Sequence, residues 1–240
     1  MIMKRHRSIS NTNALARRFG VWSPLSRTAS AQFTSANNSY LSVAGSSAFT
    51  LGTNDHTIEF WMYQTSRGQY DSPFNYNNGG SLQAANNYYL NVGSLQFGLN
   101  LGTGSGWAFN LDCGTRPSLN AWHHYAIVRN GNVFSVYVDG TSVANVTSSA
   151  SIAAQSSTSL GIGAQYVGGS YFATTGYITN FRFVNGTAVY TGNFTPSTTS
   201  LTEISGTRIL LQGLVDNREN GVTVTNVNNV TSSTESPFTS

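Results

Sequence analysis

The sequence predicts an all-β fold, a two-sheet antiparallel jelly-roll sandwich preceded by a basic amino-terminal extension. Three observations predict it. Short segments in which apolar and polar residues alternate recur along the chain, separated by turns rich in glycine and asparagine. No long segment has helical periodicity, and 240 residues is a common length for a single all-β sandwich. We therefore expect one jelly-roll domain over residues 31–240, with residues 1–30 as the extension.

The clearest strands lie in residues 120–146, which form a pattern of three antiparallel strands. Asn130-Gly131 and Asp139-Gly140 separate the alternating runs. Both pairs favour the type I′ turn of a two-residue hairpin, because its two central positions need positive φ. We expect the rest of the chain to be organised around this meander. Its first strand carries Trp122, His124, Ala126 and Val128 on one face, and His123, Tyr125, Ile127 and Arg129 on the other.

The remaining strands are expected from the same alternation. Residues 66–93 are rich in asparagine, glycine and tyrosine, which indicates a long loop or short hairpins. Residues 222–230 alternate valine with threonine or asparagine, which is typical of an exposed or edge strand. Along the chain, strands are expected at 32–34, 40–43, 57–63, 95–101, 107–111, 160–164, 177–184 and 208–212.

One resemblance follows from these segments. WHHYAIVRNGNVFSVYVDG, residues 122–140, resembles the central meander of laminin-G-like domains in the concanavalin A-like lectin/glucanase superfamily. Residues 32–43, 49–63 and 159–196 resemble further segments of that family in the same order, so the resemblance covers about residues 31–213. It implies a concanavalin A-like jelly roll. It leaves the function open, because the superfamily holds lectins, hydrolases and adhesive modules.

Composition limits the cellular setting. Charged residues make up only 9% of the chain, so the polar surface consists mainly of amides and hydroxyls. A single cysteine, Cys113, excludes an intramolecular disulfide, which fits assembly in a reducing cytoplasm. No apolar run approaches the roughly 20 residues that span a bilayer, and the basic start is not followed by an apolar signal region. We expect no membrane association.

The extension, residues 1–30, differs in charge from the rest. It carries six of the 12 Lys and Arg and no acid, so its net charge is +6; residues 31–240 carry the other six and all nine acids, a net −3. A basic arm can bind nucleic acid, but no basic face continues it on the domain, so we favour docking onto a protein. A short helix over residues 13–20 would need such a partner. The docking residues expected are Lys4, Arg5, Arg7, Leu15, Arg17, Arg18, Phe19 and Trp22.

Enzymatic and metal sites are not expected. Laminarinase-type hydrolases of the superfamily use clustered carboxylates on one strand, whereas the nine acids here are scattered and Glu59 stands alone beside Trp61 and Tyr63. His123 and His124 point to opposite faces of one strand and cannot share an ion. Asp71 and Asp112 lie in or near loops, but their spacing does not indicate a calcium site. We predict no catalytic residue, metal or cofactor.

Carbohydrate binding is the generic lectin interpretation. It requires exposed aromatic rings on which sugars stack, surrounded by amide and hydroxyl groups. The aromatic residues with suitable neighbours are Tyr70, Tyr76, Tyr88, Tyr89 and Trp107. The alternative is that these are ordinary loop and sheet residues on an asparagine-rich surface.

A second resemblance narrows the biological setting. Residues 181–196, 206–212 and 236–238 resemble the version of this module in tailed bacteriophages, cyanophages especially, where it occurs in structural and adhesive virion proteins. This implies a non-enzymatic virion protein assembled in the host cytoplasm: a capsid decoration protein whose arm binds shell or tail subunits. The alternative is a tail fibre or receptor-binding adhesin that binds host polysaccharide. A homo-oligomer would suit either. The position on the particle, the glycan and the host stay open.

Overall fold

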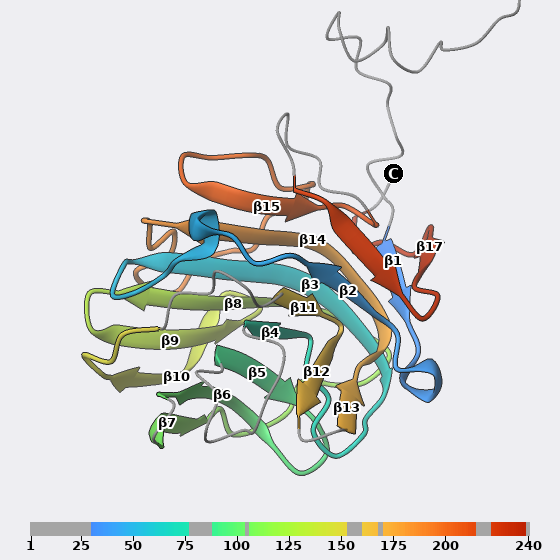
Figure 1. Ribbon diagram of the computed structural model, residues 1–240, viewed down its shortest axis with the longest axis horizontal. Helices are drawn as coiled ribbons and strands as arrows, with labels where there is room; N and C mark the ends of the chain where they lie inside the picture. Colours follow the sequence, from blue (N-terminus) through green and yellow to red (C-terminus); the bar gives the residue numbers. More distant parts are fainter. Residues whose placement is uncertain are drawn as a thin grey trace, which may run out of the picture.

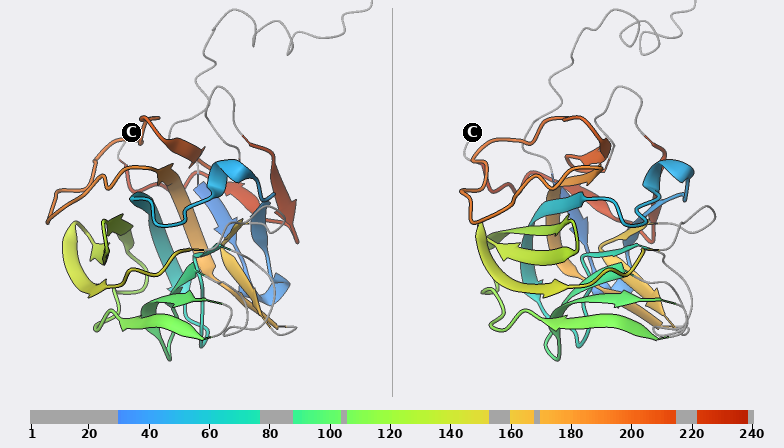
Figure 2. Two further views of the ribbon diagram at one scale, coloured as in Figure 1. Left: turned by 60° about the vertical axis from the view of Figure 1, so that its left-hand side comes forward. Right: turned by 90° about the vertical axis from the view of Figure 1, so that its left-hand side faces the viewer.

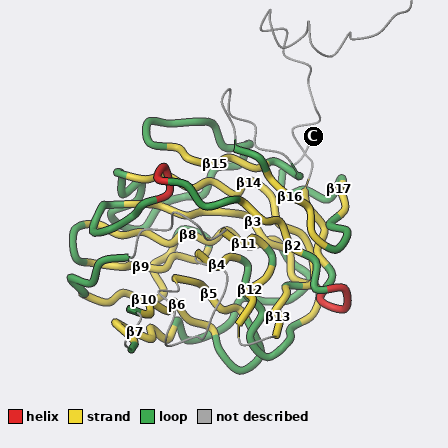
Figure 3. Tube along the Cα trace, in the orientation of Figure 1, coloured by secondary structure: helices red, strands yellow, loops and turns green. Residues whose placement is uncertain are grey.

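The computed structural model describes residues 30–76, 88–103, 106–152, 160–167, 170–214 and 222–238, which form two antiparallel sheets packed as a sandwich (Figures 1 and 2). This confirms the predicted fold class. Strands and turns account for nearly the whole trace, with two short 3₁₀ turns, η1 (Ser35–Asn37) and η2 (Ser47–Phe49) (Figure 3). Among the described residues, no helix is long and apolar enough to cross a membrane.

The eight-stranded sheet contains the predicted meander. Its strands are β1 (Ser30–Phe33), β3 (His56–Ser66), β8 (Trp122–Asn130), β9 (Val133–Val138), β10 (Thr141–Thr147), β14 (Thr175–Asn185), β15 (Thr207–Leu211) and β17 (Thr231–Ser233). Their order is β10-β9-β8-β3-β14-β1-β17, with β15 also paired to β14. β1 and β17 are antiparallel neighbours, and Ser30 pairs with Ser233.

The seven-stranded sheet forms the second layer. Its strands are β2 (Tyr40–Val43), β4 (Phe74–Tyr76), β5 (Tyr88–Val92), β6 (Phe97–Gly102), β7 (Trp107–Asp112), β11 (Leu160–Ile162) and β16 (Val224–Val227). Their order is β16-β2-β11-β4-β5-β6-β7, so the tail strand β16 lies at an edge, as predicted. β12 (Ala164–Val167) and β13 (Ser170–Ala173) form a separate hairpin.

The core lies between the sheets and is filled by the inward side of each alternating strand. On β3, Ile58, Phe60 and Met62 are buried in it, and the Phe60 ring stacks on Tyr125 and Phe181 with centroids 5.4 and 5.7 Å apart. Strand alternation therefore decides which residues are left for the two outer faces of the sandwich, and candidate sites must be built from those.

The two hairpin turns of the meander differ from each other. Asp139 and Gly140 have φ of 49° and 79°, as the predicted type I′ turn requires. At the first hairpin, Asn130 still pairs with Val133, so the turn residues are Gly131 and Asn132, and only Gly131 has positive φ. This is the pattern of a type II′ turn, with glycine at the first central position, and it corrects the predicted type I′ turn at Asn130-Gly131.

The expected single strand 160–164 is broken at Gly163. With φ of 89°, Gly163 turns the chain out of the sheet, so β11 pairs with β2 and β4 while β12 pairs only with β13. A Cβ at Gly163 would overlap the ring of Phe33, so the close packing at this position requires a glycine. The hairpin β12–β13 consequently lies beside the seven-stranded sheet (Figure 1).

Candidate functional site

The outer face of the seven-stranded sheet carries one continuous polar row. Strand register aligns residues directly opposite one another, so their side chains share one face. Their chain neighbours, such as Leu41, Phe74, Leu90 and Leu99, belong to the core, which places the row on the opposite side. In strand order from β16 to β7, the row is Thr225, Ser42, Gly161, Asn75, Tyr89, Asn100 and Asn110.

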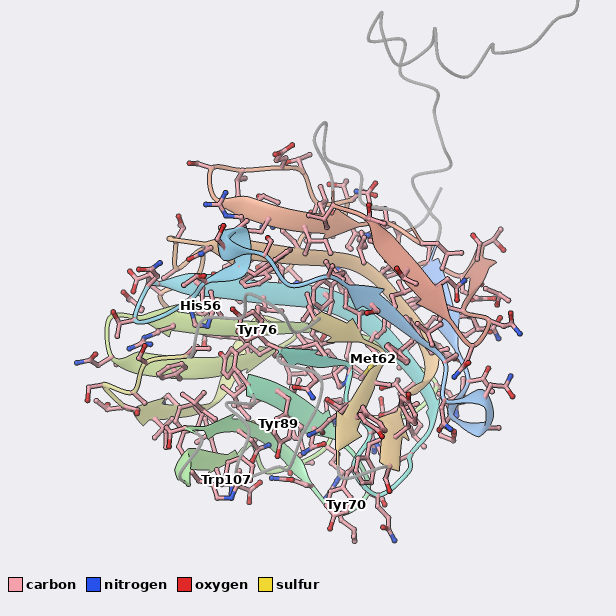
Figure 4. The ribbon with its side chains drawn as sticks, viewed as in Figure 1. His56, Met62, Tyr70, Tyr76, Tyr89 and Trp107 are labelled. Atoms are coloured by element: carbon pink, nitrogen blue, oxygen red, sulfur yellow. The ribbon has the colours of Figure 1, made fainter. Side chains whose placement is uncertain are left out.

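A β-bulge adds Trp107 to this face. Leu101 pairs with Phe109, but Gly102 pairs with Trp107, so one extra residue lies on β7 between the two pairs. The bulge turns Trp107 away from the core side on which Phe109 lies. Its half-exposed ring meets that of Tyr89 edge-on, with centroids 6.2 Å apart, and both residues lie over the lower strands in Figure 4.

Buried amides occupy the middle of the face. Asn91 donates to Gln96 Oε1 at 3.0 Å, and Gln96 donates to Asn100 Oδ1 at 3.0 Å, which links β5 to β6. Asn75 lies on the same face and is fully buried, yet neither atom of its amide has a hydrogen-bond partner, and Asn91 Oδ1 also lacks one. A buried amide without partners costs about 1–3 kcal/mol. The unpartnered atoms are themselves buried, so enclosed water, and not a ligand on the surface, would have to satisfy them.

The hairpin β12–β13 bounds the face on one side. The Gln165 side chain forms a hydrogen bond with the Tyr89 hydroxyl, whereas Gln165 Nε2 has no hydrogen-bond partner. Burial raises the pKa of that hydroxyl, a shift that the hydrogen bond from Gln165 opposes in part. Tyr89 therefore remains a neutral hydroxyl at physiological pH. On the same hairpin face, Phe172 meets Tyr70 edge-on with centroids 5.5 Å apart.

The structure divides the five predicted sugar-binding aromatics. Tyr89 and Trp107 come together on the outer face, but Tyr89 is only 2% exposed and so is also wrong as a sugar platform, which leaves the partly exposed Trp107 ring. Tyr70 is 37% exposed but lies at the hairpin, away from the polar row (Figure 4). Tyr76 and Tyr88 are buried in the core, where their hydroxyls donate to Phe49 O and contact His56 Nε2, so they are wrong as sugar platforms. The sequence analysis missed Asn75, Asn91, Asn100 and Gln165, whose amides lie on β4, β5, β6 and β12.

Glu59 lies on the opposite outer face, that of the eight-stranded sheet, and is fully buried. Arg182 Nε donates to Glu59 Oε1 at 2.8 Å, Tyr190 Oη donates to Oε2 at 2.7 Å, and His124 Nε2 lies 3.3 Å from Oε2. Burial alone would raise the pKa of the carboxyl, but His124 and Arg182 hold it below its ordinary value. The carboxylate thus anchors residue 190 and the segment around it to the sheet.

The two adjacent histidines point apart, as expected from strand geometry. His123 lies between Ser118 and Asp139, with Nε2 2.9 Å from Ser118 Oγ and Nδ1 2.7 Å from Asp139 Oδ2. Asp71 accepts from Gln64 and from the Gly68 amide, whereas Asp112 accepts from the Gly114 amide. Within the described ranges, no group of three His, Cys, Asp or Glu residues is placed to hold a metal ion.

The predicted docking residues of the arm, with the helix expected over residues 13–20, lie outside the described residues. The structure therefore leaves the arm as a prediction from the sequence.

Comparison with known protein families identifies the superfamily of this chain. The family model described as the concanavalin A-like lectin/glucanases superfamily matches residues 35–191, well over half of the chain. The chain belongs to this superfamily. The match spans strands of both sheets, including the predicted meander and the Tyr89–Trp107 face. A search of curated protein sequences found no match.

Solved structures similar to this superfamily member share its fold at low sequence identity. A putative carbohydrate-binding protein from Bacteroides ovatus has TM-score 0.58 and 14% identity, over 86% of this chain and 62% of that one. The heptameric SAP-like pentraxin of Limulus polyphemus has TM-score 0.52 and 15% identity, over 86% and 94%. Domain 4 of the GH43 arabinanase AbnA from Geobacillus stearothermophilus, in complex with arabinotriose, has TM-score 0.50 and 13% identity, over 62% and 68%.

Proposed function

We propose that the chain is a non-enzymatic carbohydrate-binding module and that the glycan binds the outer face of the seven-stranded sheet. The observation that carries this proposal is the partly exposed Trp107 ring on the outer face that also presents the exposed side chains of Asn110 and Thr225. Aromatic rings beside amide donors and acceptors are the surface that sugars require. Two of the similar structures are described as a carbohydrate-binding protein and as a complex with arabinotriose, which supports the ligand class.

Each part of the face would have a distinct role. The half-exposed Trp107 ring offers a surface for the apolar side of a sugar ring. Exposed Asn110 and the hydroxyl of Ser42 flank the centre of the polar row. Asn75, with both amide atoms buried, would not contact the glycan.

The non-enzymatic part of the proposal rests on the carboxylates. Glu59 is enclosed by Arg182, Tyr190 and His124, and its lowered pKa keeps it ionised, which does not suit a general acid. Asp71 is likewise occupied by Gln64 and the Gly68 amide. A glycoside hydrolase needs two free carboxyls on either side of the scissile bond.

Replacing Trp107 by alanine should weaken glycan binding at least about tenfold, since it removes the exposed ring of the face. A glycan array that includes bacterial surface polysaccharides would identify the ligand, and titration calorimetry would give the affinity. Val143→Ala, which removes a 38% exposed apolar side chain of β10 on the other sheet, is the matched control and should bind as the unmodified protein does. Unchanged affinity of Trp107→Ala for every ligand found would exclude this face.

We also propose that the module is carried on a phage virion through residues 1–30. The support is the resemblance of residues 181–196 and 206–212 to phage versions of the module, together with the +6 charge of the arm against −3 for the remainder. Quantitative mass spectrometry of purified particles should find the chain. A copy number near that of the main shell protein would indicate capsid decoration, and a small symmetric number would indicate a tail fibre or adhesin. Its absence from particles would refute the virion assignment.

A further inference from the structure

The outer face of the eight-stranded sheet carries a second set of aromatic rings. Tyr177 on β14, Tyr63 on β3 and Trp122 on β8 are directly opposite one another in register. Their centroids are 5.7 Å apart for Tyr63–Trp122 and 5.9 Å apart for Tyr63–Tyr177. Their neighbours Met62 and Ile178 belong to the core, so the three rings point outward. We refer to Tyr177, Tyr63 and Trp122 as the aromatic row.

The chain itself covers part of this face next to the aromatic row. Beyond the row, Trp61 meets Phe238 of the carboxy-terminal tail edge-on at 6.0 Å. His124 is the next residue after Trp122 on the same face of β8. It packs against Tyr190 and Phe194 of the segment after β14. The aromatic row lacks such a cover within the described residues, and all three side chains remain partly exposed. Three neighbouring aromatic rings that are left partly exposed on this face are suited to an external ligand.

The side chains that flank the row on β1, β17 and the end of β3 are polar and uncharged. Gln32 pairs with Tyr177 on one side, and Thr231 follows on β17, where its hydroxyl lies 3.2 Å from Gln32 Oε1. Thr65 and Thr175 flank the row near the end of β3. Amides and hydroxyls around bare rings complement the hydroxyls of a neutral sugar chain. They offer no cation to a phosphate backbone.

The size of the row also favours a narrow ligand. Three rings that are each less than about a third exposed provide at most roughly 250 Å² of contact, whereas a stable protein partner takes about 800 Å² from each side. The rings follow one another across three adjacent strands, about 4.8 Å apart, so they form a strip and not a broad patch. A linear chain of sugar units fits a strip of this kind better than a second folded domain does.

We propose that the aromatic row is a second carbohydrate-binding surface, which holds a neutral polysaccharide chain across β8, β3 and β14. The ligand class rests on the proposed function, but the surface lies on the opposite sheet from the Tyr89–Trp107 face. One module would then contact glycan on both sides of the sandwich. Two weak contacts on one polymer, or on neighbouring polymers, strengthen attachment to a dense polysaccharide layer.

The test is affinity gel electrophoresis of the full chain in arabinan, mannan, galactan and dextran, comparing Trp122→Ala with Trp107→Ala. We expect Trp122→Ala to weaken retardation by at least one polysaccharide about tenfold, while Trp107→Ala leaves a residual retardation that the double variant loses. Trp122→Phe keeps an aromatic ring and should stay within about threefold of the unmodified protein. Melting temperatures establish that each variant is folded.

The other outcomes separate the two proposals. Loss of all binding in Trp107→Ala, with Trp122→Ala unchanged, would overturn the second surface and keep the first. Loss in Trp122→Ala alone would keep the aromatic row and overturn the Tyr89–Trp107 site. Retardation of the unmodified protein by none of the polymers would overturn the row as a neutral-glycan site. So would sedimentation in which Trp122→Ala only converts a dimer to a monomer, which would assign the row to a second copy of the chain.

Discussion

Replacing Arg182 by methionine is expected to lower the free energy of unfolding by about 3–5 kcal/mol, because it leaves a buried carboxylate without its cation. Arg182 Nε donates to Glu59 Oε1 at 2.8 Å, and Nη1 donates to Thr202 O at 2.9 Å, so both partners would lose a charged donor. Glu59 is fully buried and cannot turn to water. Chemical denaturation at neutral pH, followed by tryptophan fluorescence, measures the loss.

The double variant Glu59→Gln, Arg182→Met tests whether the unpaired buried charge causes the loss of stability. It removes both charges together, so it should be more stable than Arg182→Met alone. Glu203→Gln, at an exposed acid, is the matched control and should change the free energy of unfolding by no more than about 0.5 kcal/mol. A loss below about 1 kcal/mol in Arg182→Met would mean that the ion pair contributes little to holding the segment around Tyr190 on the sheet.

Acidification from pH 6.5 to pH 4 should remove about 3 kcal/mol of stability through His56. Complete burial lowers the pKa of this ring from 6.5 to about 4; the bond to Asn54 O and the charge of Asp55 oppose the shift, and Arg129 adds to it. Because the folded pKa is the lower one, the unfolded chain takes up a proton in this window that the folded chain does not. The stabilisation is complete above pH 6.5 and is lost as the pH falls.

His56→Phe isolates this effect. It removes the titrating ring and leaves the Tyr88 hydroxyl without its contact at 3.1 Å, so it costs stability at pH 7. The informative quantity is the slope of the free energy of unfolding against pH, which should flatten between pH 6.5 and pH 4 in the variant. The pKa of Glu59 lies below its ordinary value of 4.5, so the stability that its carboxylate contributes is lost at lower pH than that of His56. An equal slope in both proteins would assign the acid sensitivity to other groups.

The fold could be predicted from sequence wherever a strand has one buried and one outer face. β3 and β8 alternate cleanly, because Ile58, Phe60 and Tyr125 face the core while Glu59 and His124 face outward. β4 and β5 were expected only as a loop or short hairpins, since β4 has three residues and β5 is buried on both faces. Without alternation, a short strand cannot be separated from a loop by its sequence.

The candidate site was only half predictable for a related reason. Tyr88 and Tyr89 are neighbours of the same type, and only the strand register decides that the first enters the core and the second reaches the outer face. Strict alternation in the sequence puts Trp107 on the same face as Phe109, and the bulge on β7 reverses this. The polar row of amides arises from pairing between distant strands, which no local pattern reveals.

Because Ser30 pairs with Ser233, the chain enters and leaves the folded domain at neighbouring positions, at one edge of the eight-stranded sheet. Two short linkers would therefore suffice to splice residues 30–233 into a surface loop of an unrelated host protein without forcing the host strands apart. The same proximity would permit circular permutation, with new ends opened in an exposed turn such as Gly131-Asn132. The sandwich is thus suited to transplantation as an inserted domain.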